Sequence, residues 1–442
     1  MSCYTPFWSG SAEVNVQGRY GSEASDITQD VRDFYDRYPY PPPPGDLDRY
    51  RRRWEDRNRR RADYHLFWPD EPYRENRSIL IAGCGTSQAA KHALRWPDAH
   101  VTGIDISSTS IRSTEALKQA YSLKNLEVCQ LPVERAGELG RRFDQVVCTG
   151  VLHHLGDPDK GLGALRAVLK PDGAMHIMVY APYGRTGIYM LQDYCRRLGI
   201  RATDREIRDL AAALAALPRD HPLANLLRNS PDFCNEAALA DALLHPQDRA
   251  YSVPQFFDFI RRGGFVFGRW MRQAPYLPQC GAIAKNPHQS RMTRLSIREQ
   301  YAAVELFRGT MVRHSAVICR DDRNGRCRPI RFDTKDWTAR VPIRMPDTIC
   351  VQQHLPPGAA AVLINRGHSF TDLYLPIDAR EKQWFDAIDG NRSIDGIMKR
   401  LCTHARDRTR ARAFFERLWW YDQVVFDASR PLIEEPGGNG ER

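Results

Sequence analysis

The chain has 442 residues, enough for two or three domains and for a sizeable hydrophobic core. Its composition is that of an ordinary globular protein, which excludes a low-complexity or fibrous chain. The net charge of +10 is compatible with acidic partners, although a solvated basic surface is the commoner explanation.

The cysteines and the N-terminus indicate the cellular compartment. Eleven cysteines are scattered without a CxxC pair or a His/Cys cluster at zinc spacing, which favours reduced thiols and predicts no metal. The first residues lack the basic and apolar regions of a signal peptide, and no apolar run is long enough to span a bilayer. We therefore expect a cytoplasmic protein that does not associate with membranes.

The N-terminal segment is predicted to contain a strap and a basic helix. Residues 1–30 are polar and are expected to be poorly ordered. The proline-rich stretch 39–44 forces an extended or polyproline II conformation, and Asp46 or Asp48 can cap a helix that runs to about His65. Acidic residues interleave with the many arginines of that helix, so a solvated, salt-bridged face is favoured over a surface for nucleic acid or an acidic protein.

From Arg77 onward, short apolar strands alternate with helical stretches. This alternation predicts a parallel sheet with helices on both faces. The rhythm breaks at 185–250, where we expect an inserted helical lid, and it resumes with a helix and a strand in 251–271 and again in 296–320. The first predicted strands are 78–83, 100–106, 125–131, 143–151 and 173–181, and the helices among them are 87–96, 107–122 and 157–169.

The chain changes character after residue 320. Short strand-like pieces separated by proline and glycine occupy 325–376, and a pattern of three helices and a short strand follows in 377–428. The second pattern resembles the winged-helix domains that bind leader peptides of ribosomally made natural products, although many winged helices are only docking or dimer elements. The predicted domains are the strap and basic helix at 1–75, a sheet domain at 76–320 and a C-terminal α+β domain at 321–442.

A stretch with two glycines, ILIAGCGTSQ at 79–88, indicates a ligand site. Glycines at the end of the first strand of a parallel sheet let the backbone approach a ligand, and the next helix offers free N–H groups. Asp105 ends the second strand about 20 residues past Gly85, where an acidic residue accepts hydrogen bonds from ribose hydroxyls. These features predict an adenosine-type cofactor at the carboxyl edge of the sheet.

Two cofactors share this geometry. A dinucleotide places its pyrophosphate at the helix start, where the third glycine of GxGxxG assists packing, but Gln88 occupies that position here. S-adenosylmethionine has no phosphate and needs only a close backbone approach and the acidic residue. The missing glycine therefore argues against a nicotinamide dinucleotide more than against S-adenosylmethionine.

Four motifs in order, ILIAGCGTSQ, VTGIDIS, FDQVVCTGVLHHL and LRAVLKPDGAMHIMVY, resemble the class I S-adenosylmethionine-dependent methyltransferases. The resemblance covers 77–182 and extends more weakly to about 320. It implies a doubly wound, Rossmann-like α/β fold with S-adenosylmethionine as the cofactor. In that family the first loop lies against the methionine part, the acidic residue holds the ribose, and the loops after the third and fourth strands flank the adenine and the substrate. The matching positions are Gly83, Cys84, Gly85, Ser87, Asp105, Ile106, Leu131, Pro132 and Gly150.

Two positions depart from the family pattern. Ile81 stands where the family often has an acidic residue, and Ser87 replaces the last glycine of the usual G-x-G-x-G. Ser87 is small enough for close approach, whereas Ile81 removes one polar anchor. These departures keep open a catalytically degenerate scaffold that binds the cofactor and presents the C-terminal domain to a partner. An NAD-dependent reductase is a third hypothesis, which Gln88 disfavours.

Histidines and tyrosines near the strand ends are the candidate catalytic residues. His153 and His154 follow the fourth strand, where either can act as a general base or simply pack in the turn. Tyr38 lies in FYDRYPY, which is similar to N-terminal segments that fold over the cofactor in many of these methyltransferases. Tyr183 and Arg185 follow the fifth strand, where they can line a substrate pocket and recognise an anionic group.

The predicted activity is methyl transfer from S-adenosylmethionine to an oxygen, nitrogen or carbon nucleophile. The sulfonium is already activated, so the protein must mainly exclude water and hold the nucleophile in line at about 3 Å, with modest base assistance. We expect a small-molecule or peptide substrate from biosynthetic metabolism and no metal. A homodimer is compatible with the sequence.

Overall fold

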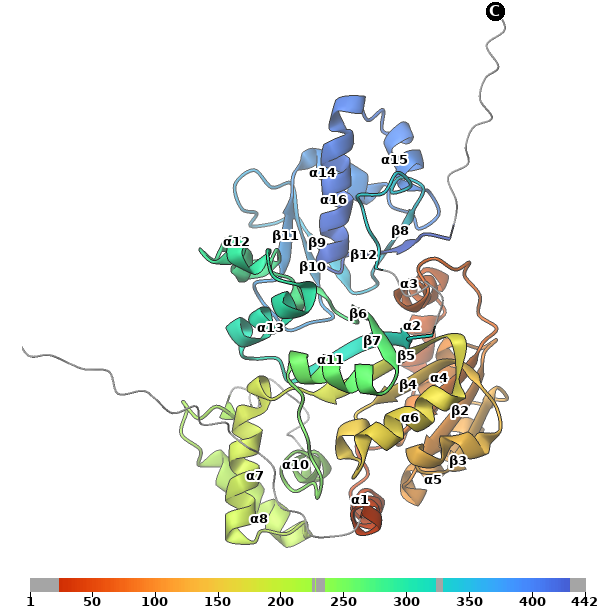
Figure 1. Cartoon of the computed structure of the whole chain (residues 1–442), viewed down its shortest axis with the longest axis vertical. Coiled ribbons are helices and arrows are strands. Elements are labelled where there is room, and N and C mark those ends of the chain that lie inside the picture. The colour runs from red at the N-terminus through yellow and green to blue at the C-terminus, as the bar shows by residue number, and fades with distance from the viewer. Residues whose placement is uncertain (1–23, 225–226, 228–234, 323–328, 430–442) are drawn as a thin grey trace, which may run out of the picture.

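The structure is a computed structural model that describes residues 24–224, 227, 235–322 and 329–429 (Figure 1). Seven strands form a central sheet in the order β3-β2-β1-β4-β5-β7-β6. Strands β1 to β5 run parallel, whereas β7 is antiparallel to both of its neighbours. The strands are β1 (Ser78–Ala82), β2 (His100–Asp105), β3 (Leu126–Gln130), β4 (Phe143–Thr149), β5 (Leu169–Tyr180), β6 (Phe265–Trp270) and β7 (Arg313–Arg320).

The strand order reverses between β1 and β4. The chain passes from β1 outward to β2 and β3 and then crosses back to place β4 on the other side of β1. In open α/β sheets, ligands bind outside the carboxyl ends of the strands at such a reversal. The loops that begin at Gly83 and Gly150 lie there, so the predicted doubly wound fold is confirmed, and it presents the glycine motif at the expected edge.

Both faces of the sheet are covered because its strands are apolar on both sides. Leu80 and Ala82 of β1 face a core that includes α6, α11 and α13, whereas Ile79 and Ile81 face a core with α3 and α4. Side chains alternate between faces along a strand, so a buried parallel strand is a continuous apolar run. The covering helices are α3 (Arg57–Phe67), α4 (Gln88–Arg95), α5 (Ser108–Ala120), α6 (Pro158–Val168), α11 (Val253–Arg262) and α13 (Ile297–Arg308).

The N-terminal segment differs from its prediction in two ways. The single helix expected over 46–65 is two helices, α2 (Asp48–Trp54) and α3, because Asp56 caps α3 by accepting a hydrogen bond from the Asn58 N–H at 2.9 Å. Helix α1 (Ala24–Arg37) begins inside the stretch that we expected to be poorly ordered, since its apolar residues Val31 and Phe34 are buried. The rest of that stretch, 1–23, lies outside the described residues.

The lid has its own hydrophobic cluster. Ile188, Leu210 and Leu243 of the lid helices pack with Phe34 and Tyr38 of the N-terminal segment, so the lid and α1 form one layer beside the sheet (Figure 1). The lid helices are α7 (Thr186–Leu198), α8 (Asp204–Ala215) and α10 (Glu236–Leu243).

The described residues of the C-terminal region form two small sheets and three α-helices. Strands β11-β10-β9 form one antiparallel sheet, and β12 pairs with β8. The helices and β12 follow the predicted order, but β12 pairs with the earlier β8, and a winged-helix role in peptide binding stays a prediction. The elements are β8 (Val341–Arg344), β9 (Thr348–Val351), β10 (Ala361–Asn365), β11 (Tyr374–Ile377), α14 (Ala379–Asp386), α15 (Ile394–Arg400), α16 (Arg408–Trp420) and β12 (Val424–Asp427).

The C-terminal region is anchored to the central sheet. Asp422 is buried, forms an ion pair with Arg269 of β6 at 3.1 Å and accepts the Ala274 N–H at 2.9 Å. Ile343 and Val425 belong to the same core as β1 and α4. Among the described residues, none of the helices is both long and apolar enough to cross a membrane.

Candidate active site

A cavity of about 1040 Å³ lies at the carboxyl edge of the sheet. Pockets for one small ligand measure about 300–1,000 Å³, so this cavity can hold a cofactor together with an acceptor. Its wall is built by the N-terminal strap, the loops after β1, β2, β3 and β4, the lid, the ends of β5, β6 and β7, and residues 366–370 after β10.

The glycine loop adopts a conformation that requires its glycines. Gly83 and Gly85 have φ angles of +72° and +51°, in the left-handed region that side chains disfavour. A Cβ on Gly83 would lie 2.1 Å from a methyl carbon of Val151. The Gly83 N–H donates to the Ile104 carbonyl oxygen at 2.9 Å, so the loop curls back over the end of β2.

Asp105 joins the glycine loop to the start of α5. Its carboxylate accepts the Gly85 N–H at 2.8 Å and the Ser107 N–H at 2.9 Å. Burial raises the pKa of Asp105, although these backbone donors oppose the shift. A carboxylate has about four acceptor positions, and the backbone donors do not fill all of them, so acceptor capacity remains for ligand hydroxyls on the cavity wall.

The remaining residues predicted for the cofactor divide into two groups. Ile106, Pro132 and Gly150 line the cavity, while the others are buried behind it: Cys84, Ser87 and Leu131. Gln88 and Glu134 also line the cavity, and sequence reasoning did not include them. Gln88 drew attention only as a missing glycine, and Glu134 lies beyond the loop that the motif covers.

The strap lies directly over the glycine loop. Tyr40 and Pro41 line the cavity, and the Thr86 hydroxyl donates to the Pro41 carbonyl oxygen at 2.8 Å. Asp36 at the end of α1 accepts the Ser107 hydroxyl at 2.8 Å and thereby fixes the strap to the start of α5. The strap therefore contributes to the wall around a ligand.

Tyr38 lies outside the cavity wall. It is buried between α1 and the lid, and its hydroxyl donates to Asp204 at 2.7 Å. Tyr35, one helical turn earlier, does line the cavity and donates to Asp241 at 2.9 Å. Within the strap, the structure thus places Tyr35 and Tyr40 at the site, while Tyr38 connects the strap to the lid.

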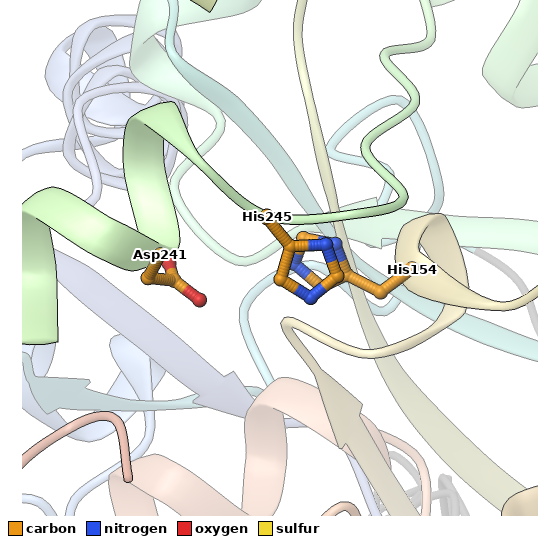
Figure 2. A group of neighbouring side chains, drawn as sticks. All are labelled: His154, Asp241 and His245. Carbon is orange, nitrogen blue, oxygen red and sulfur yellow. The ribbon is translucent and has the colours of Figure 1, made fainter. Parts of the chain in front are cut away.

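His154 reaches the cavity in a defined tautomer. Its Nδ1 lies 2.7 Å from the Gln247 carbonyl oxygen, which can only accept, so Nδ1 carries the proton and Nε2 keeps its lone pair. Figure 2 shows His154 beside Asp241 of α10 and His245. One potential ligand atom of each of these residues lies within 4.8 Å of the others. Burial raises the pKa of Asp241, and a positive charge on the nearby His154 acts in the opposite direction.

The donor pattern of this trio does not fit a metal centre. His245 Nδ1 accepts the Gln247 N–H at 3.0 Å, so a neutral His245 carries its proton on Nε2 and offers no lone pair there. The His154 and His245 rings also lie face to face, 3.9 Å apart and tilted by 34°, so their in-plane lone pairs do not converge. The arrangement suits proton transfer at His154 better than metal binding.

His153 and Tyr183 do not line the cavity, and Arg185 lines it with its charge already paired. His153 is fully buried against Tyr180, with ring centroids 3.9 Å apart, and burial lowers its pKa well below the usual range. Tyr183 is 40% exposed and does not line the cavity. Arg185 does line it, but its guanidinium pairs with Asp248 at 3.1 Å.

Several basic residues of the cavity were missed by sequence reasoning. Arg272 follows β6, Arg313 begins β7, and Arg366 and His368 follow β10. These residues come from three separate segments, and no motif connects them. Only the packing of the C-terminal region against the sheet brings them together.

Comparisons with known proteins agree with the fold and the glycine motif. Residues 80–175 match a family described as Methyltransferase domain. Uncharacterized protein syc1184_c from Synechococcus sp. is 32% identical over 295 residues, which covers 64% of this chain and 69% of that protein. Malonyl-[acyl-carrier protein] O-methyltransferase from Acetivibrio thermocellus is 30% identical over 120 residues, which covers 27% of this chain and 41% of that protein. The chain thus spans less than half the length of that O-methyltransferase.

A solved structure has a similar fold over most of the chain. PKMT2 from Rickettsia typhi, in complex with AdoHcy, has a TM-score of 0.58 at 15% identity and covers 85% of this chain and 76% of its own. The likeness extends beyond the sheet domain, since the sheet domain alone is a smaller share of the chain. At this level of identity it shows a shared fold.

Proposed function

The chain belongs to the class I S-adenosylmethionine-dependent methyltransferases, and we propose that it methylates a small-molecule or peptide acceptor through an oxygen, nitrogen or carbon nucleophile that His154 deprotonates. S-adenosylmethionine is the cofactor and supplies an activated methyl group. The observation that carries the proposal is the His154 tautomer, which leaves Nε2 unprotonated on a histidine that lines the cavity.

The cavity wall supports a specific placement of the cofactor. Gly83 and Gly85 permit close backbone approach by the methionine part, as argued from their left-handed φ angles. The free acceptor positions of Asp105 suit the ribose hydroxyls. Ile106 and Pro132 offer apolar and flat surfaces for the adenine. Residues 40–41 of the strap then cover the methionine side and exclude water.

In this proposal the residues of the lid assist the proton transfer. The Nδ1–H bond to Gln247 holds the His154 ring so that Nε2 can take the acceptor's proton as the new bond to carbon forms. Asp241 lies close enough to stabilise the resulting imidazolium, and Tyr35 orients Asp241 through its 2.9 Å hydrogen bond. Electrons of the broken S–C bond stay on sulfur, which leaves S-adenosylhomocysteine.

The two departures from the family pattern do not obstruct this chemistry. Ile81 is buried in the core beneath α3 and α4, and Ser87 is buried behind the glycine loop. Neither side chain lines the cavity. A degenerate scaffold therefore has no observation in its favour, and Gln88 stands where a dinucleotide site would need a glycine.

Calorimetry and labelling together test the proposal. We expect S-adenosylhomocysteine to bind the purified chain and NAD not to bind. Methyl-labelled S-adenosylmethionine, incubated with fractionated metabolites and peptides, should transfer label in the presence of the wild type and far more slowly in the presence of His154→Gln. Binding of NAD without S-adenosylhomocysteine would refute the cofactor, and equal transfer by both proteins would refute the role of His154.

A further inference from the structure

Apart from Arg185, which pairs with Asp248 beside the lid, the charged residues that line the cavity are separated by sign. The loops near the glycine motif and the lid contribute acidic residues, which suit a cationic sulfonium and an imidazolium: Asp105, Glu134 and Asp241. The ends of β6 and β7 and the loop after β10 contribute the basic residues Arg272, Arg313, Arg366 and His368. The sulfonium of the cofactor and the imidazolium explain the acidic residues of the cavity. No step of the proposed reaction uses the basic residues.

The basic residues lie at a distance from the reacting centre that a substrate can span. Arg313 is the first residue of β7 and pairs in register with Tyr180 at the end of β5. Arg272 follows β6, the outermost strand, which lies three strands from β4 in the sheet order. Neighbouring strands are about 4.8 Å apart, so the basic cluster begins roughly 10–15 Å along the sheet edge from the loop after β4.

Two basic side chains of the cluster have buried polar atoms without partners. Nε of Arg272 and both ring nitrogens of His368 are buried, and none has a hydrogen-bond partner among the described residues. Burial and the nearby Arg272 lower the pKa of His368 to about 4, so its ring is neutral at neutral pH and carries one N–H donor. Buried donors without partners are uncommon in folded proteins, and a ligand that accepts hydrogen bonds would satisfy these.

Arg272 is paired with Asp347, but carboxylates of the described residues do not neutralise the charges of the other two arginines of the cluster. Arg313 and Arg366 are exposed to the cavity or solvent, and neither forms a salt bridge with any residue that the structure describes. The nearby carboxylates are already engaged, since Asp347 pairs with Arg272 at 3.3 Å and Asp372 pairs with Arg308 at 3.1 Å. An anion would therefore meet uncompensated charge.

We propose that this cluster, formed jointly by the sheet domain and the C-terminal region, binds a carboxylate or phosphate group of the methyl acceptor. Guanidinium groups match both anions with paired N–H donors, and the concave wall favours a compact group over an extended polyanion. The acceptor would then be an acidic molecule, held by its anionic group at one end while its nucleophile lies at His154. This inference rests on the proposed methyl transfer and adds the substrate class.

The test uses the full-length chain saturated with S-adenosylhomocysteine, titrated calorimetrically at constant ionic strength. Inorganic phosphate is the probe in one arm and succinate in the other, so the two arms distinguish the two anions. The variant Arg313→Gln with Arg366→Gln removes two charges of the cluster. The matched control, Arg205→Gln with Arg208→Gln, removes two exposed charges of α8, which are not among the cavity residues.

We expect at least one probe to bind the wild type and the control with equal affinity and the cluster variant at least tenfold more weakly. Absence of saturable binding by both probes, or equal binding by all three proteins, would overturn the inference. Affinity for S-adenosylhomocysteine is measured first and should be the same in all three proteins. If the wild type did not bind S-adenosylhomocysteine, the proposed function would be refuted. If it bound S-adenosylhomocysteine but neither anion, only the anion subsite would be refuted.

Discussion

At the residue scale, His154 is set apart from its neighbour by hydrogen bonding. Its Nδ1 is held by a carbonyl oxygen and its ring meets the cavity, whereas His153 is enclosed by Tyr180 and other core residues. The sequence HHL favours His154 over His153 only slightly, because a 3₁₀ turn at Leu152–His154 decides which ring faces the ligand. That choice depends on Gln247 in the lid, which is too distant in the chain for any local pattern.

Replacing His154 tests its role as a base. We expect His154→Gln to lower the methyl-transfer rate about 10²–10⁴-fold, the usual contribution of general base catalysis, with no change in S-adenosylhomocysteine affinity. His100→Gln, at the opposite, amino-terminal edge of the sheet, is the matched control and should retain the full rate. Full activity of His154→Gln in a rate assay would show that the acceptor reacts without this base.

Asp105 is expected to make cofactor affinity depend on pH. Asp105→Ala should weaken S-adenosylhomocysteine binding by about 1.5–3 kcal/mol for each lost hydrogen bond to the carboxylate. Because burial raises the pKa of Asp105, the ionised form that binds is lost at a higher pH than for an ordinary aspartate. Affinity measured by calorimetry should therefore be constant near neutrality and fall on acidification in the wild type, but not in Asp105→Ala. A dissociation constant that the substitution leaves unchanged would mean that the ribose is held elsewhere.

At the element scale, the parallel strands followed directly from the sequence, because buried strands are continuous apolar runs bounded by turns. The ends of helices were harder to predict. Asp56 splits the basic helix into two with a single side-chain cap, and α1 is stabilised by tertiary contacts, among them the packing of Phe34 against the lid and the hydrogen bonds that Asp36 accepts from the start of α5. The polar sequence of α1 gives little local indication of a helix. Tertiary packing overrides weak local preference in such segments.

The strap should become more protected when the cofactor binds. Residues 30–45 already contact the glycine loop through Thr86 and the start of α5 through Asp36. A bound cofactor adds contacts with Tyr40 and Pro41, so hydrogen exchange in this segment should slow on addition of S-adenosylhomocysteine. Asp36→Ala removes an anchor, which should weaken affinity and reduce that protection. Equal exchange with and without ligand would leave the strap as a packing element.

At the scale of the whole molecule, the domain boundary that we predicted from composition divides residues that pack in one hydrophobic core. A boundary near residue 320 matches the end of β7, and the change in pattern there is visible in the sequence. Contacts across the boundary are not visible, because they join single residues such as Arg269 and Asp422. The same holds for the basic cluster of the cavity, to which both regions contribute.

Truncation after Arg320 tests whether the sheet domain can stand alone. The separation of a cofactor domain from a recognition domain predicts that S-adenosylhomocysteine affinity survives the cut, provided that the core of the first domain is complete. The structure shows that residues after 320 belong to this core, so the truncation would leave it incomplete. Ile343 and Val425 pack in the same core as β1 and α4, and removal of Asp422 leaves Arg269 without its buried ion-pair partner.

We therefore expect the truncated chain to be unfolded or strongly destabilised, and the substitution Asp422→Asn in the full chain to cost about 3–5 kcal/mol, the usual loss when one partner of a buried pair is removed. Circular dichroism and thermal melting measure both effects. Asp395→Asn, which removes an exposed i,i+4 partner of Lys399 at 3.1 Å, should change stability by less than about 1 kcal/mol. A folded truncation with wild-type cofactor affinity would show instead that the C-terminal region contributes only to the acceptor end of the cavity.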